Sequence, residues 1–192
     1  PVPGRDIFVQ AWYQGGISIM DFTDSANPYE IAFFDRGPML EDSLLSGGFW
    51  STYFYKGFVY GTEMVRGLDV LELLPSEYLS VNEIEAAKLA FPKHGPKNIF
   101  NPQQQTEMTW PINPTLALAY LDQVKREGSI DNNNEEILRS SLLGLESRTS
   151  AENHKILSII KEFSELGSSK FTQSSEKTSV LQDVLKELIS KA

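Results

Sequence analysis

The order of apolar and polar positions divides the chain into an aromatic part and a part rich in leucine and isoleucine. Apart from Tyr120, Phe163 and Phe171, every aromatic residue lies within residues 1–111, in short runs interrupted by glycine and turn sequences. Such runs predict β-strands. Residues 112–192 place Leu and Ile at helical spacing among Lys, Glu and Ser, which predicts helices. We therefore expect an α+β chain, with N-terminal antiparallel β-meander units followed by a small C-terminal helical bundle.

Two segments of the aromatic part repeat each other. Residues 7–22 align with residues 58–73 when Gly16 is placed on Gly67. The other matching positions are Ile17 with Leu68, Ile19 with Val70, Asp21 with Glu72 and Phe22 with Leu73. Each segment predicts two strands joined at a glycine, because the turn requires a positive φ that glycine adopts without a Cβ penalty.

A further strand accompanies each segment. The sequence Thr23–Pro28 has turn chemistry and precedes a predicted strand at Tyr29–Phe34, and an aromatic strand at Phe49–Tyr55 precedes the second segment. Repeats of about 40–50 residues built from short strands are typical of β-propeller blades, and a closed propeller needs about 4–8 blades. We therefore expect an incomplete β-propeller, namely its last two blades. The alternative is a self-contained β-sandwich of about seven strands.

The same segments carry a family resemblance. The stretch Gly16–Phe22, with Asp24 and Pro28, resembles the repeat of the LVIVD family, a group of bacterial, mostly secreted or envelope-associated, propeller-like proteins. The stretch Trp50–Gly61, followed by Arg66–Val70, is similar to the last repeat of such proteins. The resemblance covers residues 5–74. It implies a propeller whose other blades lie upstream and an extracellular or cell-envelope location, and it implies no catalytic residues.

A proline-rich segment separates the two parts. Prolines recur between Phe91 and Pro114, and proline lacks the backbone donor that a helix interior or a central strand needs. The predicted organisation is a β-propeller-type region at 1–79, a short helix with a proline-rich strap at 80–111, and a helical bundle at 112–192. The strap is expected to lie on the β surface, anchored by Ile99, Phe100 and Trp110; the alternative is a linker.

Capping sequences predict where the helices begin and end. Ser80–Glu83 forms a capping box that starts a helix from Val81 to about Leu89. Four helices are predicted in the last part of the chain. Asn113 with Pro114 starts the first, which Gly128 ends, and the second runs from Glu135 to about Glu146. Thr149 with Glu152 starts the third, which Gly167 ends, and Ser179 with Gln182 starts the fourth. Their apolar stripes predict a bundle of three or four helices. The alternative use of such a stripe is a groove for a partner helix.

Composition excludes several classes of function. Acidic residues outnumber basic residues, 26 to 17, and a net charge of -9 leaves no basic footprint for nucleic acid. The absence of cysteine excludes disulfides, thiolate metal ligands and a cysteine nucleophile, and the chain has only two histidines, His94 and His154. No apolar run reaches the roughly 18 residues of a membrane span. No motif predicts a cofactor, a metal site or a catalytic set.

Carboxylates and tryptophans are the candidate binding residues. Asp21, Glu63 and Asp69 could hold a cation or act on a glycosidic bond if the fold brings them to one face. The alternative for these carboxylates is a structural role. Trp12 and Trp50 are candidates for stacking on a sugar ring or a peptide.

The alternative for the tryptophans is burial. Strand alternation over Phe49–Tyr55 places Trp50, Thr52 and Phe54 on one face, and both faces of the strand are then largely apolar. That pattern is typical of a strand buried between neighbouring blades.

Together these features predict a non-catalytic repeat protein that acts as an interaction or scaffold module. Its expected partners are another protein or the remaining propeller blades of the same parent chain, and an oligomer is compatible with both. The alternative is a propeller hydrolase that uses a metal ion or paired carboxylates at the propeller axis. That alternative requires Asp21, Glu63 and Asp69 to converge.

Overall fold

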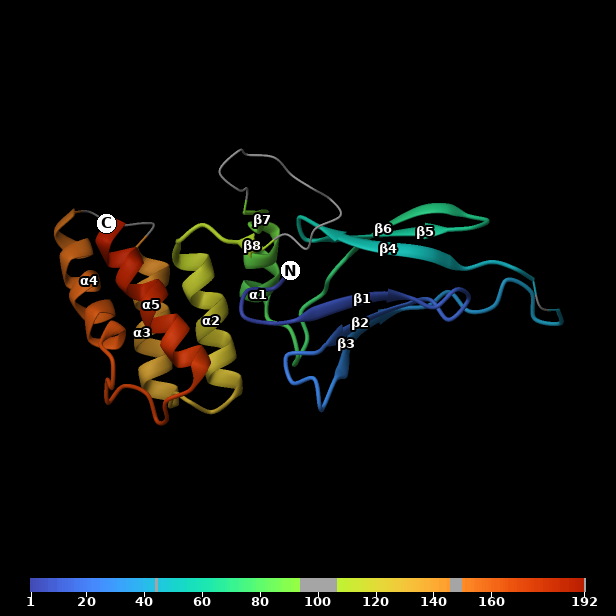
Figure 1. Cartoon of the computed structure of the whole chain (residues 1–192). Coiled ribbons are helices and arrows are strands. Elements are labelled where there is room, and N and C mark those ends of the chain that lie inside the picture. Colours follow the sequence, from blue (N-terminus) through green and yellow to red (C-terminus); the bar gives the residue numbers. More distant parts are fainter. Residues whose placement is uncertain (44, 94–106, 146–149, 192) are drawn as a thin grey trace. The chain divides into compact units, whose positions relative to one another are not determined.

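The computed structural model describes residues 1–43, 45–93, 107–145 and 150–191. The chain divides into two compact units, Pro1–Thr109 and Trp110–Ala192. Two three-stranded antiparallel sheets come first and helices dominate the rest of the chain (Figure 1). The expected α+β class is therefore confirmed.

The described part of the first unit holds eight strands and one helix. Their bounds are β1 (Ile7–Ala11), β2 (Ile17–Asp21), β3 (Tyr29–Phe34), β4 (Phe49–Tyr55), β5 (Phe58–Glu63), β6 (Gly67–Glu72), α1 (Val81–Lys88), β7 (Phe91–Pro92) and β8 (Met108–Thr109). The two larger sheets have the orders β1-β2-β3 and β4-β5-β6, and β7 pairs with β8. Each larger sheet is thus a meander in chain order.

The sequence repeat relates only part of each sheet to the other. β1 and β2 correspond to β5 and β6, and the hairpin glycines Gly16 and Gly67 both have positive φ, 82° and 97°. The expected strands Tyr29–Phe34 and Phe49–Tyr55 are present with these bounds. The third strand therefore follows the repeated hairpin in one sheet and precedes it in the other.

The two sheets form two layers that enclose one apolar core (Figure 1). Ile17 and Ile19 of β2 and Val59 of β5 are buried in this core. Gly61 of β5 leaves space for the Ile17 side chain, because a Cβ at Gly61 would lie only 2.8 Å from Cδ1 of Ile17. Burying a side chain such as Ile17 stabilises the fold by about 1.5–3 kcal/mol.

The layers are close together at one edge and apart at the other. β1 lies beside β4, where Tyr13 and Phe49 form an isolated antiparallel bridge. At the opposite edge, a groove opens between β3 and β6. α1 adds Ile84 and Ala87 to the same core. Its capping box is confirmed, since Ser80 Oγ accepts the N–H of Glu83 while the Glu83 carboxylate accepts the N–H of Ser80.

The strand β4 differs from the expected alternation. Its register with β5 shifts between Phe49 and Ser51, a β-bulge at Trp50. Phe49 and Phe54 consequently both reach the core, although alternation predicts opposite faces. Tyr53 and Tyr55 are exposed together with Trp50. The prediction of a strand buried on both faces is therefore wrong in this structure, because a neighbouring sheet covers only one face.

The proline-rich segment is only partly described. Phe91–Pro92 pairs with Met108–Thr109 as a two-residue ladder. Ile99 and Phe100, two predicted anchors of the strap, lie outside the described residues. Trp110 packs against the apolar core of the helical unit, so its predicted place on the β surface is wrong. Trp110 comes just before a helix of that unit, and its ring joins the core to which that helix contributes.

The described residues of the second unit form four helices around one core. They are α2 (Pro114–Arg126), α3 (Asn132–Gly144), α4 (Ser150–Ser164) and α5 (Glu176–Lys191). Leu121, Leu138, Phe163 and Leu185 are among the fully buried side chains of the core. The predicted start of α2 at Asn113 and Pro114 is confirmed, as Asn113 Oδ1 accepts the N–H of Leu116 at 2.9 Å. None of the described helices is long and apolar enough to cross a bilayer.

Two predicted helix starts are wrong, and one cannot be compared. α3 begins at Asn132 rather than Glu135, because the Asp131 carboxylate accepts the N–H of Asn134 and caps the helix three residues earlier. α5 begins at Glu176 rather than near Ser179. There, Ser175 Oγ accepts the N–H of Thr178 (3.1 Å) and Thr178 Oγ1 accepts the N–H of Ser175 (2.6 Å). Thr149, the predicted start of α4, lies outside the described residues.

Candidate functional site

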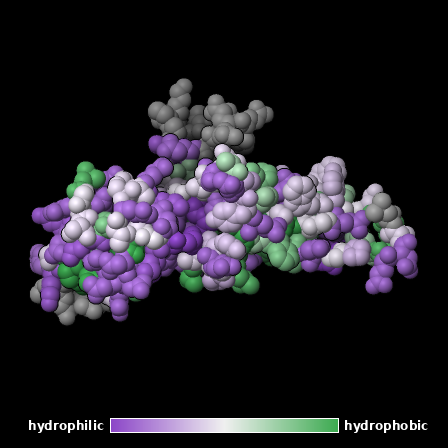
Figure 2. Space-filling model, turned by 90° about the horizontal axis from the view of Figure 1, so that it is seen from below, coloured by the Kyte–Doolittle hydropathy of each residue, from purple (hydrophilic) through white to green (hydrophobic). Residues whose placement is uncertain are grey.

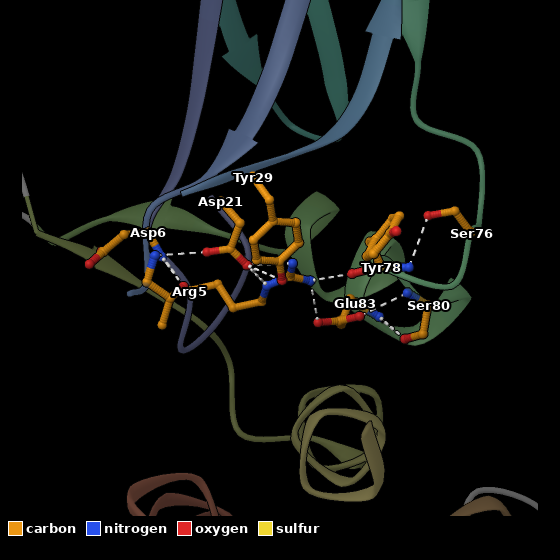
Figure 3. A network of polar contacts seen from close by, with 9 residues as sticks. Arg5, Asp6, Asp21, Tyr29, Ser76, Tyr78, Ser80 and Glu83 are labelled. Atoms are coloured by element: carbon orange, nitrogen blue, oxygen red, sulfur yellow. Dashed lines mark hydrogen bonds and ion pairs between the residues drawn. The ribbon is translucent and has the colours of Figure 1, made fainter. Parts of the chain in front are cut away.

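A buried ion network connects the start of the chain with β2 and α1 (Figure 3). The Arg5 guanidinium donates to Oδ2 of Asp21 from Nε (2.8 Å) and Nη2 (2.6 Å), and to Oε1 of Glu83 from Nη1 (2.8 Å). Nη1 also donates to the carbonyl of Tyr78 (2.7 Å), and the Tyr29 hydroxyl donates to Asp21 (3.1 Å). All three charged side chains are buried. The network therefore uses Asp21 structurally.

The charge of Asp21 is held by its neighbours. Burial by itself would raise the pKa of Asp21, but hydrogen bonds from Thr23 and the contact with Arg5 together lower that pKa below the usual value of a carboxyl. The backbone N–H of Thr23 lies 2.8 Å from Oδ1 of Asp21. Asp21 is thus a stable anion whose role is to balance a buried cation.

The sequence indicates Asp21 as a candidate but gives no sign of its partners. It predicts Glu83 only as part of a capping box, and that role occupies Oε2, which accepts the N–H of Ser80 at 2.8 Å. Its other oxygen, Oε1, is left to bind Arg5. No local pattern joins Arg5 to two carboxylates that lie 16 and 78 positions away in the chain.

Glu63 organises the turn after β5. Oε1 accepts the N–H of Gly48 (2.6 Å), and Oε2 accepts the N–H groups of Val65 (3.2 Å) and Arg66. Burial would raise the pKa of this carboxyl, but the three backbone donors and the Arg66 charge lower it overall. All these contacts serve the backbone, so Glu63 is a structural anion as well.

Asp69 lies on the inner face of β6 and pairs with Arg36. Arg36 Nη2 donates to Oδ1 of Asp69 at 2.5 Å, and the guanidinium lies over the Phe34 ring, 5.3 Å from its centroid. Phe34 in turn meets Phe49 edge to face. The pair therefore connects β6 to the segment after β3.

The candidate carboxylates do not form a common site. Asp21, Glu63 and Asp69 each bind a different set of partners. Within the residues that the structure describes, no group of three His, Cys, Asp or Glu side chains could hold a metal ion. The condition set for the hydrolase alternative is therefore not met in this part of the chain.

Trp12 and Trp50 are both more than half exposed, unlike core tryptophans. Trp50 meets Tyr13 edge to face, with ring centroids 5.9 Å apart. Tyr13 has a φ of 54°, and its carbonyl accepts the N–H of Phe49 at 2.9 Å. Gly48 allows this close approach, since a Cβ there would lie 2.0 Å from the Tyr13 carbonyl carbon. The two predicted stacking residues thus lie at the surface near the junction of β1 and β4.

The larger exposed apolar surface is the outer face of the β4-β5-β6 sheet. Strand register places Tyr53 opposite Tyr60 and Tyr60 opposite Val70, and places Leu68 on the same face. We call these four residues the open face. Tyr53 is 65% exposed, Leu68 62% and Val70 53%. A contiguous exposed apolar patch is a candidate interaction surface.

The repeat allows the open face to be compared with the equivalent positions of the other sheet. Leu68 and Val70 correspond to Ile17 and Ile19, which are only 2% and 6% exposed because they pack against the other sheet. The same positions of the repeat are therefore buried in one sheet and exposed in the other. The β4-β5-β6 sheet contributes its opposite face, with Val59 and Leu71, to the shared core.

The β1-β2-β3 sheet also has an uncovered face. Register places Phe8 opposite Met20, and Ser18 opposite Phe33, away from Ile17 and Ile19. Phe8 and Phe33 are exposed. Figure 2 shows one side of the surface, on which apolar side chains lie between polar ones.

No family model, curated protein or solved structure matches this chain. The resemblance to LVIVD repeats therefore stays a prediction that depends on the residues named above.

Proposed function

We propose that this chain is a non-catalytic repeat protein whose three-stranded sheets stack into a larger propeller-like array. It serves as an interaction or scaffold module at the cell surface or outside the cell, as the LVIVD resemblance implies. The supporting observation is the different burial of repeat-related residues, with Ile17 and Ile19 in the core and Leu68 and Val70 exposed.

That difference favours head-to-tail stacking over a symmetric sandwich. A two-fold sandwich would bury the same face of both repeats, because such an interface is self-complementary. Here one sheet contributes the Ile17 face and the other contributes the face opposite to Leu68. A head-to-tail contact leaves one complementary face uncovered at each end, and these faces can accept further sheets.

The wedge between the layers favours a curved array. The sheets meet at β1 and β4 and diverge toward β3 and β6. Repeating such a wedge turns the stack around its narrow edge, which is how blades surround a propeller axis. In this arrangement, the partner of the open face is another three-stranded sheet.

Sedimentation equilibrium tests the proposal. We expect the chain to self-associate over the micromolar to millimolar range, because its two uncovered faces are complementary. The double variant Tyr53→Lys with Val70→Lys should stay monomeric, since stacking would bury two unpaired charges.

A matched control separates the open face from general surface hydrophobicity. Leu143→Lys with Leu166→Lys places the same charges at exposed apolar positions of the helical unit and should associate like the wild type. A chain that is monomeric at every concentration would contradict the proposal, and so would equal effects of the two double variants.

A further inference from the structure

The groove between β3 and β6 has features that the stacking proposal does not use. Its volume is about 700 Å³, and its apolar wall comes from both sheets, with Ile17 and Ile31 on one side and Val59 and Leu71 on the other. It lies between the two layers of the first unit and is separate from the open face.

Both strands beside the groove are edge strands. β3 is last in the order β1-β2-β3, and β6 is last in the order β4-β5-β6. An edge strand presents backbone N–H and C=O groups along its free side, which makes it a template for another strand. The groove thus combines an apolar interior with backbone groups that can form a ladder.

The rim of the groove is acidic. Glu30, Glu72 and Glu77 border it, and its described lining includes no Lys, Arg or His. The charges of Glu30 and Glu72 are only partly balanced. The neutral Ser18 hydroxyl donates to Glu30 (2.6 Å), and Lys88 Nζ, which lies 3.3 Å from Glu72, is shared with Glu85 (2.8 Å). The net charge of -9 adds a field of the same sign, which favours a cationic ligand.

We propose that this groove binds an extended basic peptide as an added strand along β3. Alternate side chains of a strand point to opposite faces, so apolar residues of the peptide enter the groove while basic residues lie beside Glu30 and Glu77. The peptide backbone pairs with the free side of β3. The partner is thus a segment in which apolar and basic residues alternate.

The experiment uses fluorescence anisotropy with a labelled peptide of alternating Val and Lys. Two matched peptides are compared with it: one carries Glu in place of Lys, and the other is N-methylated at alternate backbone amides. Both should bind at least about tenfold more weakly, since one loses the charge complementarity and the other loses the ladder donors. A single-chain amine, dodecylamine below its micelle concentration, tests a non-peptide occupant.

Protein variants locate the site. Glu30→Lys with Glu77→Lys should weaken binding of the Val/Lys peptide by about tenfold or more. The control Glu136→Lys with Glu187→Lys makes the same change in net charge on the helical unit. Because only the long-range effect of net charge remains in this control, its affinity for the peptide should stay within about twofold of that of the wild type. The open-face variants Tyr53→Lys and Val70→Lys should bind the peptide normally, which keeps this test independent of stacking.

Three results would overturn the proposal. The first is no binding of the Val/Lys peptide, and the second is equal binding of the N-methylated peptide. The third is binding of dodecylamine that requires Glu30 and Glu77 and that the Val/Lys peptide does not displace.

Discussion

Arg5 is bound by two carboxylates from different elements, Asp21 of β2 and Glu83 of α1. Removing such charges from water costs several kcal/mol for each ion, and the cost is offset only when the remaining polar atoms are paired. Here both Arg5 Nη atoms, its Nε, and the oxygens of Asp21 and Glu83 have partners. The network therefore fixes where the first residues, β2 and α1 meet.

Replacing Arg5 should be costly. Arg5→Met leaves two buried carboxylates without their cation and should lower the free energy of unfolding by about 3–5 kcal/mol. Arg36→Met removes an ion pair that is partly exposed and should cost about 1 kcal/mol or less. Urea unfolding of both variants, followed by near-UV circular dichroism, measures the difference. Equal losses would show that the Arg5 network is not the stabilising feature described here.

The pH dependence of stability follows from Asp21 and Glu63. Both carboxyls have a pKa below the usual value in the folded state, so the unfolded chain binds protons more readily. Their contribution to stability is complete above the unfolded pKa of about 4 and is lost as pH falls through the lower folded pKa. We expect the free energy of unfolding to fall below about pH 4.

Asp21→Asn should reduce this slope, because the substituted residue no longer titrates. Urea unfolding at a series of acidic pH values measures it. An unchanged slope in Asp21→Asn would mean that Asp21 binds protons equally in the folded and unfolded states.

At the scale of elements, the two hairpins share a glycine but differ in their surroundings. Gly16 and Gly67 both have positive φ, which costs an ordinary residue about 1–2 kcal/mol. A Cβ at Gly16 would lie 2.1 Å from the Phe34 carbonyl oxygen, whereas a Cβ at Gly67 meets nothing within 4 Å.

Gly67→Ala should therefore lose about 1–2 kcal/mol from backbone strain alone, and Gly16→Ala should lose clearly more, because the added methyl displaces β3. Urea unfolding of both variants gives the comparison. A larger loss in Gly67→Ala would contradict the account of the turn.

The start of α5 gives a further prediction. Ser175 and Thr178 cap each other, so Ser175→Ala should destabilise the helical unit by about 0.5–2 kcal/mol, the usual range for a lost cap. Ser179→Ala, inside the helix, should change stability by less than about 0.5 kcal/mol. Thermal unfolding by circular dichroism tests it; a larger effect at Ser179 would place the cap where the sequence predicted it.

Local signals explain which elements the sequence predicts. The capping box at Ser80 and the Asn113–Pro114 pair each determine a helix start, and turn residues delimit the strand Tyr29–Phe34. The sequence does not predict the start of α5, because Ser175 and Thr178 lack the Glu or Gln of the usual capping box.

The candidate site was less predictable. The partners of Asp21 are remote in sequence, and the bulge at Trp50 interrupts the alternation on which face assignments depend. Leu68 and Ile17 occupy the same position of the repeat but differ in exposure, because only Ile17 is covered by the other sheet, and the segment itself does not encode that difference.

At the scale of the whole molecule, the proposed head-to-tail stacking predicts a specific contact between copies. Within the first unit, β1 lies beside β4 at the narrow edge of the wedge. If the same wedge repeats between copies, β4 of one copy lies beside β1 of the next. Tyr53 of the open face and Phe8, which is exposed on the outer face of β1, then come close together. A symmetric contact would instead bring Tyr53 near Tyr53 of the second copy.

Cross-linking of paired single-cysteine variants tests this central claim most directly. The chain has no cysteine of its own, so Tyr53→Cys and Phe8→Cys report only the intended contact. When a mixture of the two variants is treated with a short bismaleimide, the product that joins Tyr53→Cys to Phe8→Cys should form in clear excess over either homodimer. A predominance of Tyr53→Cys homodimers, or no cross-linked product at all, would contradict head-to-tail stacking.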